Sequence, residues 1–308
     1  MAKSIPYNAW LKAFRLRTLP LALASISMGG FLAAGYKNFK IEIFLLCILT
    51  TVLLQILSNL ANDYGDYMNG ADLTGRIGPE RSVQSGAISP AVMKNAIVLF
   101  AFLSFASGLY LLYISSTFQS FNTFGFFLVL GILAIVASIK YTAGKNPYGY
   151  SGLGDISVLI FFGWVAVCGS FFLQTRTIYL EILLPATSCG LFATGVLNIN
   201  NIRDIESDAE AGKKTIPMRL GKEKAVWYHM ALLLTGFLCT LVFTILTYKS
   251  LWQLLFLISV PLLILNIVKV KTLDSKNLDP YLKQMAITTL IFVFSFGIGF
   301  LLSISCIS

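Results

Sequence analysis

Nine apolar segments, each near the length that crosses a lipid bilayer, constrain this chain more than any other feature. A helix of about 20 apolar residues spans the hydrocarbon core of a membrane. Only 12% of the residues are charged, whereas soluble domains have about 25%. This disfavours a large soluble helical protein and predicts an all-α, polytopic membrane protein. The predicted spans are 19–36, 43–62, 95–115, 121–140, 154–173, 182–200, 225–248, 251–268 and 285–307.

The distribution of positive charge agrees with nine spans. This count places 19 of the 23 Lys and Arg residues on one side of the membrane, and only Lys37, Lys40, Arg176 and Lys249 on the other. Because positive loops stay in the cytoplasm, we expect a cytoplasmic N-terminus and an external C-terminus. The net charge of +9 then suits an anionic leaflet and gives no reason to expect nucleic acid as a partner.

An acidic pattern ends the sixth apolar span. Asn200, Asp204 and Asp208 are spaced i, i+4 and i+8, which places all three on one face of a helix. Solvated loop ends need no such register. The pattern therefore predicts a built cluster of oxygen ligands.

A related pattern ends the second span. Asn62 and Asp66 have the same spacing, but the next step falls on Gly70, and a further carboxylate comes at Asp72. Asp63 lies beside Asn62, about 100° around the helix. Both patterns are expected at the same membrane face, so their oxygens are predicted to meet.

Such a cluster of carboxylates requires cations. Mg²⁺ is the natural candidate, because it prefers oxygen ligands and combines one or two carboxylates with waters and substrate phosphates. The predicted metal ligands are Asn62, Asp63, Asp66, Asp72, Asn200, Asp204 and Asp208. The single histidine, His229, is expected to be a packing residue, and the five cysteines have no CxxC spacing.

A basic loop follows each acidic pattern. "RIGPERSVQSG" contains Arg76 and Arg81, and "AGKKTIPMRLG" contains Lys213, Lys214 and Arg219. Cations beside a magnesium site are suited to the remaining charge of a diphosphate. The likeness of the two halves also suggests one membrane domain, 1–308, with pseudo-repeats at about 19–140 and 154–268 and a last helix at 285–307.

At these residues the sequence resembles the UbiA superfamily of intramembrane aromatic prenyltransferases. The stretches "NDYGDYMNGAD…RIGPERSVQSG", "LNINNIRDIESDAEAGKKTIPMRLG", "YTAGKNPYGYSGLGD" and "RLRTLPLALA" are similar to its branch that prenylates 1,4-dihydroxy-2-naphthoate in menaquinone synthesis. The resemblance implies nine helices around a central cavity that opens to the cytoplasmic side, in a bacterial cytoplasmic (inner) membrane.

The resemblance also implies an activity. A long prenyl group would move from its diphosphate to the naphthoate, with loss of CO₂ and diphosphate, to give demethylmenaquinol. Metal-bound Asp66, Asp204 and Asp208 would act in catalysis, and Asp72 is expected to replace the carboxylate missing at Gly70. Asn62, Arg76, Arg81, Lys214 and Arg219 would bind the diphosphate.

Further roles concern the allylic cation and the acceptor. Tyr141, with Tyr148 and Tyr150, is expected to steady the cation. Asp155 is a candidate base or phenol-orienting group, and Arg15, Arg17 and Lys145 are candidates for binding the acceptor carboxylate.

Several alternatives stay open at this stage. Another aromatic acceptor, such as 4-hydroxybenzoate, homogentisate or a haem ring, would use the same centre, and a transporter would also contain intramembrane acids. A CDP-alcohol phosphotransferase is disfavoured because the chain lacks its D-G-x-x-A-R run. Tail length and oligomeric state are not fixed by the sequence.

Overall fold

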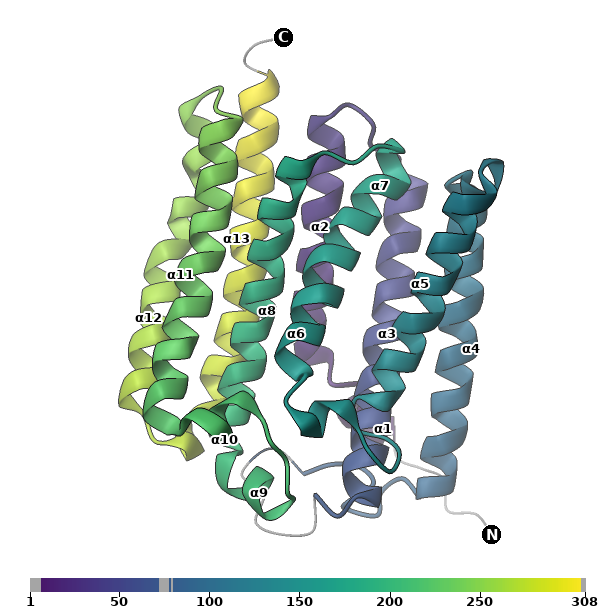
Figure 1. Cartoon of the computed structure of the whole chain (residues 1–308), viewed down its shortest axis with the longest axis vertical. Helices are drawn as coiled ribbons and strands as arrows, with labels where there is room; N and C mark the ends of the chain where they lie inside the picture. Colours follow the sequence, from purple (N-terminus) through teal and green to yellow (C-terminus); the bar gives the residue numbers. More distant parts are fainter. Residues whose placement is uncertain (1–6, 72–77, 79, 306–308) are drawn as a thin grey trace.

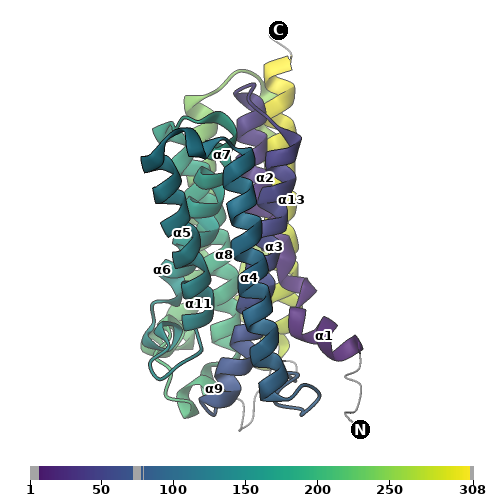
Figure 2. The ribbon, with the colours of Figure 1, turned by 90° about the vertical axis from the view of Figure 1, so that its right-hand side faces the viewer.

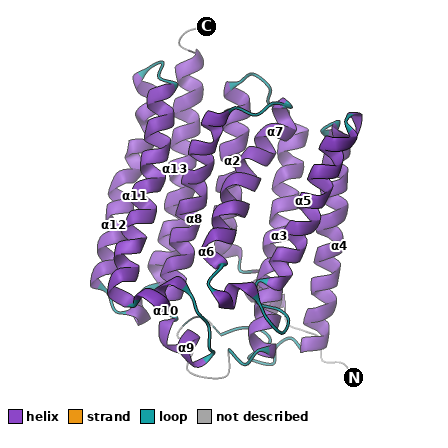
Figure 3. Cartoon of the chain, in the orientation of Figure 1, coloured by secondary structure: helices purple, strands orange, loops and turns teal. Residues whose placement is uncertain are grey.

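The described part of the chain is a bundle of long helices. The computed structural model describes residues 7–71, 78 and 80–305, and these residues contain helices and loops but no strand (Figure 3). The long membrane helices are α2 (Leu19–Gly35), α3 (Ile41–Met68), α4 (Pro90–Ile114), α5 (Phe121–Lys140), α8 (Leu183–Arg203), α11 (Lys222–Leu246) and α13 (Asp279–Ser305). Two spans are composite: α6 (Gly154–Val158), η4 (Leu159–Cys168) and α7 (Gly169–Thr175) form one, and η6 (Leu251–Ser259) with α12 (Val260–Thr272) forms the other.

The predicted nine spans are confirmed. Nine helices among the described residues are long and apolar enough to cross a membrane. Their outer faces carry large apolar side chains, such as Phe102, Phe126 and Ile258, which are 65%, 64% and 64% exposed. Water would disfavour so many exposed apolar groups, whereas lipid tails match them. The chain is therefore a multi-pass membrane protein.

Several span boundaries differ by a few residues from the sequence prediction, and two of the differences concern charged residues. Helix α3 continues to Met68, so Asp63 and Asp66 lie on the helix and not beyond it. Helix α13 begins at Asp279, with Pro280 in its first turn. The apolar pattern stops at charged residues, but helical hydrogen bonding continues through them. Proline is well tolerated at this first position, because its missing N–H has no helical partner there.

The arrangement of the helices brings both acidic patterns to one end of the bundle. The span that contains α8 has the largest buried share, followed by those of α2 and α13, while α4 and α5 flank one side and α11 and α12 the other (Figure 1). The C-terminal ends of α3 and α8 lie at the same end as the short helices α9 (Ile205–Glu210) and α10 (Ile216–Leu220). Helix α1 (Tyr7–Phe14) projects sideways from this end of the bundle, and the C-terminal end of α13 lies at the other end (Figure 2). The pseudo-repeat remains a prediction.

A buried polar network joins α11, α12 and α13. Asn266 Oδ1 accepts a hydrogen bond from His229 Nε2 at 2.9 Å, and Asn266 Nδ2 donates to Tyr281 O at 2.9 Å and to Gln284 Oε1. Gln284 in turn donates to Leu262 O at 3.0 Å. His229 and Asn266 are fully buried. Such polar contacts hold membrane helices together where the hydrophobic effect does not, so His229 is a packing residue as predicted.

We expect Asn266→Ala to lower the stability of the protein in detergent by about 1–3 kcal/mol, because it removes the hydrogen-bond partner of the buried His229 ring and of two half-buried groups, Tyr281 O and Gln284 Oε1. The measurement is thermal unfolding of the purified protein. Asn38→Ala is the matched control, because Asn38 is exposed and makes one hydrogen bond, to Tyr36 O. Equal melting temperatures for both variants would contradict a structural role of the network.

Candidate functional site

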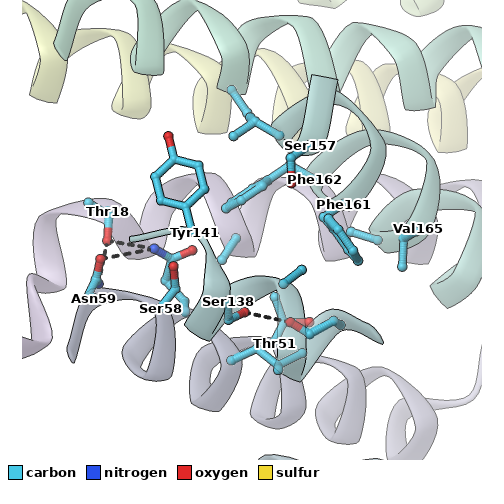
Figure 4. A pocket seen from close by; sticks show the side chains of 18 of the residues that line it. Thr18, Thr51, Ser58, Asn59, Ser138, Tyr141, Ser157, Phe161, Phe162 and Val165 are labelled. Atoms are coloured by element: carbon cyan, nitrogen blue, oxygen red, sulfur yellow. Dashed lines mark hydrogen bonds between the residues drawn. The ribbon is translucent and has the colours of Figure 1, made fainter. Parts of the chain in front are cut away.

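A single elongated cavity connects the two acidic patterns with the apolar interior. Its volume is about 440 Å³. Both acidic patterns contribute to its charged end; along the bundle it is lined mainly by apolar residues with scattered hydroxyl groups. In Figure 4, Thr18, Ser58 and Asn59 lie toward one end, while Phe161 and Val165 lie toward the other.

The first acidic pattern is held against the segment 141–153. Thr142 Oγ1 donates to Asn62 Oδ1 at 2.9 Å, and Asn69 Nδ2 donates to Thr142 O at 2.8 Å. Gly65 permits this approach, because a β-carbon there would come within 2.6 Å of the Thr142 carbonyl. Asn62 and Asp66 consequently face the cavity.

The second acidic pattern keeps its helical register although α8 ends at Arg203. The N–H of Asp204 donates to Asn200 O at 3.0 Å, and the N–H of Asp208 donates to Asp204 O at 2.8 Å. These bonds preserve the i, i+4, i+8 spacing across the junction between α8 and α9. All three predicted residues line the cavity, which confirms that they share one face.

Lys213 joins the two patterns. Its ammonium lies 2.9 Å from Asp208 Oδ1, 3.6 Å from Asp66 Oδ1 and 4.8 Å from the centre of the Tyr150 ring. Burial alone would lower the pKa of Lys213, but Asp66 and Asp208 raise it above its usual value. The lysine therefore remains charged. The oxygen-rich ends of α3 and α8 meet around one cation.

Arg81 neutralises the other side of Asp66. Its guanidinium forms an ion pair with the Asp66 carboxylate and donates to Asn62 O. The turn that carries Arg81 is fastened by Asp63, whose carboxylate accepts the N–H of Ser82 at 3.1 Å and that of Val83 at 3.3 Å. Asp63 does not line the cavity. The structure thus places Asp63 as a support for Arg81 and does not bring it to the predicted metal ligands.

The segment between α5 and α6 supplies aromatic rings. Tyr141, Tyr148 and Tyr150 all line the cavity, and the Tyr141 ring packs edge-on against Tyr148 with centroids 5.4 Å apart. Tyr150 Oη donates to Asp66 Oδ1. Figure 4 shows the Tyr141 ring projecting into the cavity beside Phe162. Burial, and then Asp155, raise the pKa of Tyr141 well above its usual range, so its phenol stays neutral.

The donor set fits a hard divalent cation. Asn62, Asp66, Asn200, Asp204 and Asp208 present carboxylate and amide oxygens to one cavity, whose described lining has no imidazole and whose cysteine, Cys47, lies about five turns of α3 away from Asp66. Within the described ranges, no three His, Cys, Asp or Glu residues are close enough to hold a metal by themselves. A bound Mg²⁺ would therefore complete its coordination with water and phosphate oxygens, as Mg²⁺ commonly does.

Some predicted diphosphate-binding residues do not line the cavity. Lys214 and Arg219 are exposed. Arg219 donates to Lys214 O at 3.1 Å and to Ser151 O at 2.8 Å, and Lys214 N donates to Tyr150 O at 2.8 Å. They tie the loop after α9 to the segment 141–153, and of the three cations predicted in this loop, Lys213 is the one that lines the cavity. The predicted residues Asp72 and Arg76 lie outside the described residues.

The residues predicted to bind or orient the acceptor also divide into those that line the cavity and those that do not. Arg15 lines the cavity, whereas Arg17 forms an ion pair with Asp279 at 2.9 Å and Lys145 is exposed. Asp155 is buried and accepts a hydrogen bond from Tyr228 Oη at 2.9 Å, and it does not line the cavity. Neither Arg17, Lys145 nor Asp155 is brought to the cavity, because each has its place in a loop or packing contact.

Sequence reasoning missed Arg203. Its side chain is 1% exposed and forms ion pairs with Asp204 at 2.7 Å and with Asp279. The available signal was the position of Arg203, a charged residue at the end of an apolar helix and directly before the predicted ligand Asp204. Its partner Asp279 is 76 positions away in the chain, so no local pattern could reveal the pair.

The apolar part of the cavity follows α3 from Asp66 to Cys47. With a helical rise of about 1.5 Å per residue, this stretch is roughly 28 Å long. That is close to the thickness of the hydrocarbon core of a bilayer. The site combines an anion- and cation-binding end with an apolar channel of membrane dimensions.

Comparisons with known proteins agree with this geometry. Residues 22–296 match the model of the UbiA prenyltransferase family. The chain is 46% identical over 297 residues to a 1,4-dihydroxy-2-naphthoate octaprenyltransferase of Escherichia coli, covering 96% of each chain. It is 47% identical over 298 residues to the enzyme of that name from Haemophilus influenzae, covering 95% of this chain and 96% of the relative.

Solved structures show the same fold. A UbiA homologue from Aeropyrum pernix superimposes with a TM-score of 0.68 at 16% identity, covering 92% of this chain and 97% of that one. A homologue from Archaeoglobus fulgidus, bound to GPP and Mg²⁺, gives a TM-score of 0.65 at 19% identity, covering 96% and 99%.

The different positions of Lys213 and Lys214 lead to a prediction. Lys213→Met removes the cation between Asp66 and Asp208, so we expect it to weaken binding of inorganic diphosphate with Mg²⁺ by roughly tenfold or more. Isothermal titration of the detergent-solubilised protein provides the measurement. Lys214→Met makes the same chemical change on an exposed neighbour and is expected to leave the affinity nearly unchanged. Equal losses in both variants would contradict the assignment.

Proposed function

The chain belongs to the UbiA prenyltransferase family, and from this premise we propose that it transfers a long-chain prenyl group from a prenyl diphosphate to 1,4-dihydroxy-2-naphthoate. CO₂ and diphosphate leave, and the product is demethylmenaquinol, a step of menaquinone biosynthesis. The two relatives that are 46% and 47% identical over nearly the whole chain support this acceptor.

One observation carries the proposal: a single cavity is charged at one end and apolar along the rest. A prenyl diphosphate has the same division, with a trianionic head and a hydrocarbon tail. The head suits the end where Asp66, Asp208 and Lys213 meet, and the tail suits the channel along α3. A substrate held in this way keeps its tail out of water and its reacting carbon at the polar end.

Mg²⁺ is the proposed cofactor. Its proposed ligands are the cavity-lining residues Asn62, Asp66, Asn200, Asp204 and Asp208, and the carboxylate of Asp72 stays a predicted addition. When bound, Mg²⁺ neutralises charge on the departing diphosphate.

Arg81 and Lys213 take the rest of that charge. Both already lie within reach of Asp66, so a bound diphosphate draws them from the carboxylates toward its own oxygens. Fixed cations in a low-dielectric site stabilise the charge that develops as the C–O bond breaks. The residual allylic cation faces Tyr141, whose neutral ring offers its π-face. The walls of the cavity keep water from this cation.

Arg15 is the proposed partner of the acceptor carboxylate. It lines the cavity, and its Nη2 is buried without a hydrogen-bond partner among the described residues. Its backbone adopts the left-handed conformation, with φ of 47°, and such residues cluster at functional sites. The new C–C bond forms at the ring carbon that bears the carboxylate. The bond to that carboxylate then breaks, its electron pair returns to the ring, and CO₂ leaves.

The proposed setting is the bacterial cytoplasmic membrane, with the N-terminus and the charged end of the cavity toward the cytoplasm and the C-terminus outside. The excess of Lys and Arg on the loops of that side supports this orientation. A soluble aromatic acid then reaches the charged end from the cytoplasm, while the prenyl substrate enters from lipid.

We expect the purified protein to prenylate the naphthoate with loss of CO₂ only when Mg²⁺ is present. The experiment supplies one prenyl diphosphate and a panel of aromatic acids, including 4-hydroxybenzoate and homogentisate, and identifies products by mass. Asp208→Asn should abolish turnover while membrane insertion is kept. Preferred turnover of another acid would overturn the acceptor assignment, and absence of diphosphate release with every acid would overturn the activity.

Arg15→Gln should raise the KM for the aromatic acid about tenfold or more, because a charge-assisted hydrogen bond is lost. The KM for the prenyl diphosphate should change little. Steady-state kinetics with each substrate varied in turn separates the two effects. Lys12→Gln is the matched control, since Lys12 is an exposed cation of the preceding helix. A larger change in the KM for the diphosphate would contradict the role given to Arg15.

A further inference from the structure

Arg203 is the last residue of α8, and its guanidinium is shared by three side chains. Nε and Nη2 donate to the two carboxylate oxygens of Asp204 at 2.8 and 2.7 Å, and Nη2 also donates to Asn200 Oδ1 at 2.9 Å. Nη1 donates to Asp279 Oδ1 at 2.5 Å. All three nitrogens of the guanidinium are therefore engaged by oxygens.

This arrangement fixes two residues that line the cavity. Asp204 and Asn200 both contribute to its charged end, whereas Arg203 and Asp279 do not line it. A carboxylate has about four lone-pair sites, so Asp204 keeps acceptor capacity when both its oxygens bind Arg203. The planar fork of arginine sets the angle of such a pair as well as its distance.

Asp279 is the member that anchors the fork. It is the first residue of α13, and its second oxygen accepts from Arg17 Nη1 at 2.9 Å. The chain of charges runs from Arg17 through Asp279 and Arg203 to Asp204, so it connects the start of α2 and α13 with the end of α8. Without Asp279, the Arg203 guanidinium keeps only Asp204 as a carboxylate partner, and the two side chains can rotate together.

We propose that Asp279 is a positioning residue for the prenyl-transfer centre: it holds the Arg203 guanidinium, which in turn orients Asp204 and Asn200 toward the cavity. This inference rests on the proposed function, because it assigns Asp204 and Asn200 to the centre that receives Mg²⁺ and diphosphate. Asp279 acts through Arg203 and does not touch the substrate. A purely structural residue would change the stability of the protein but not the chemistry of each folded molecule.

The test compares Asp279→Asn with a matched control. Asp274→Asn makes the same change on an exposed carboxylate shortly before α13. Two quantities are measured: kinetics per folded molecule, including the Mg²⁺ concentration for half-maximal rate, and the rise in melting temperature on adding farnesyl diphosphate with Mg²⁺.

For Asp279→Asn we expect a 10- to 100-fold loss, roughly, in kcat/KM for the prenyl diphosphate, a higher Mg²⁺ requirement and a smaller thermal shift, as for residues that orient metal ligands. Asp279→Glu should recover part of the loss, because it restores the charge. The Asp274→Asn control should stay within about threefold of the wild type.

The proposal is overturned if Asp279→Asn has near-normal kinetics and thermal shift and only a lower melting temperature, or if Asp274→Asn has an equal effect. If Asp279→Asn does not fold, the same measurements on Asp279→Glu and Arg203→Lys decide, and near-normal values in both overturn it. The thermal shift needs no acceptor. A wild-type protein that binds the diphosphate but does not prenylate the naphthoate would therefore contradict the proposed function alone, and leave the positioning role testable.

Discussion

Charge inside a lipid-embedded bundle must be neutralised locally, and this constraint organises the polar end of the molecule. Desolvating a carboxylate is costly unless a cation and hydrogen bonds compensate. Asp66 has Arg81 and Lys213, Asp208 shares Lys213, and Asp204 has Arg203. Each described carboxylate of the cavity is thus paired within the chain. The helices, the segment 141–153 and the two basic loops are arranged so that these pairs can form.

The fold supplies the positions that this pairing needs. Helices α3 and α8 bring their C-terminal ends to one side of the bundle, and the segment 141–153 lies between them (Figure 1). That segment contacts α3 through Thr142 and the loop after α9 through Tyr150. A close backbone approach at Gly65 removes the space that would otherwise separate the first motif from the tyrosines. The polar end is therefore rigid where the two motifs face each other, although most of the bundle is held by apolar packing.

The features that could be predicted from the sequence are those that local patterns determine. Apolar length determined the nine spans, and i, i+4, i+8 spacing placed Asn200, Asp204 and Asp208 on one face. Tertiary contacts decide which of the adjacent lysines Lys213 and Lys214 reaches the cavity. The sequence alone could therefore not distinguish between them. The role of Asp63 and the partnership of Arg203 with Asp279 depended on residues 19 and 76 positions away. Long-range ion pairs leave no periodic signal, and for that reason the supporting residues escaped prediction while most of the charged residues that line the cavity did not.

The same ion pairs allow the carboxylates and cations of the cavity to exchange partners with a bound metal and diphosphate. Two of the carboxylates proposed to bind Mg²⁺, Asp66 and Asp208, form ion pairs with Arg81 and Lys213. In the proposed function, the metal supplies positive charge for these carboxylates and the diphosphate supplies negative charge for the two cations, so each partner can be exchanged without leaving a bare charge. Arg203 differs, because it is buried and fixed on Asp204 by contacts outside the cavity. The site therefore combines two cations that face the proposed diphosphate position, Arg81 and Lys213, with one buried cation, Arg203, that keeps the acidic face in place. This division follows from the need to bind a highly charged head group in a protein whose surroundings are hydrocarbon.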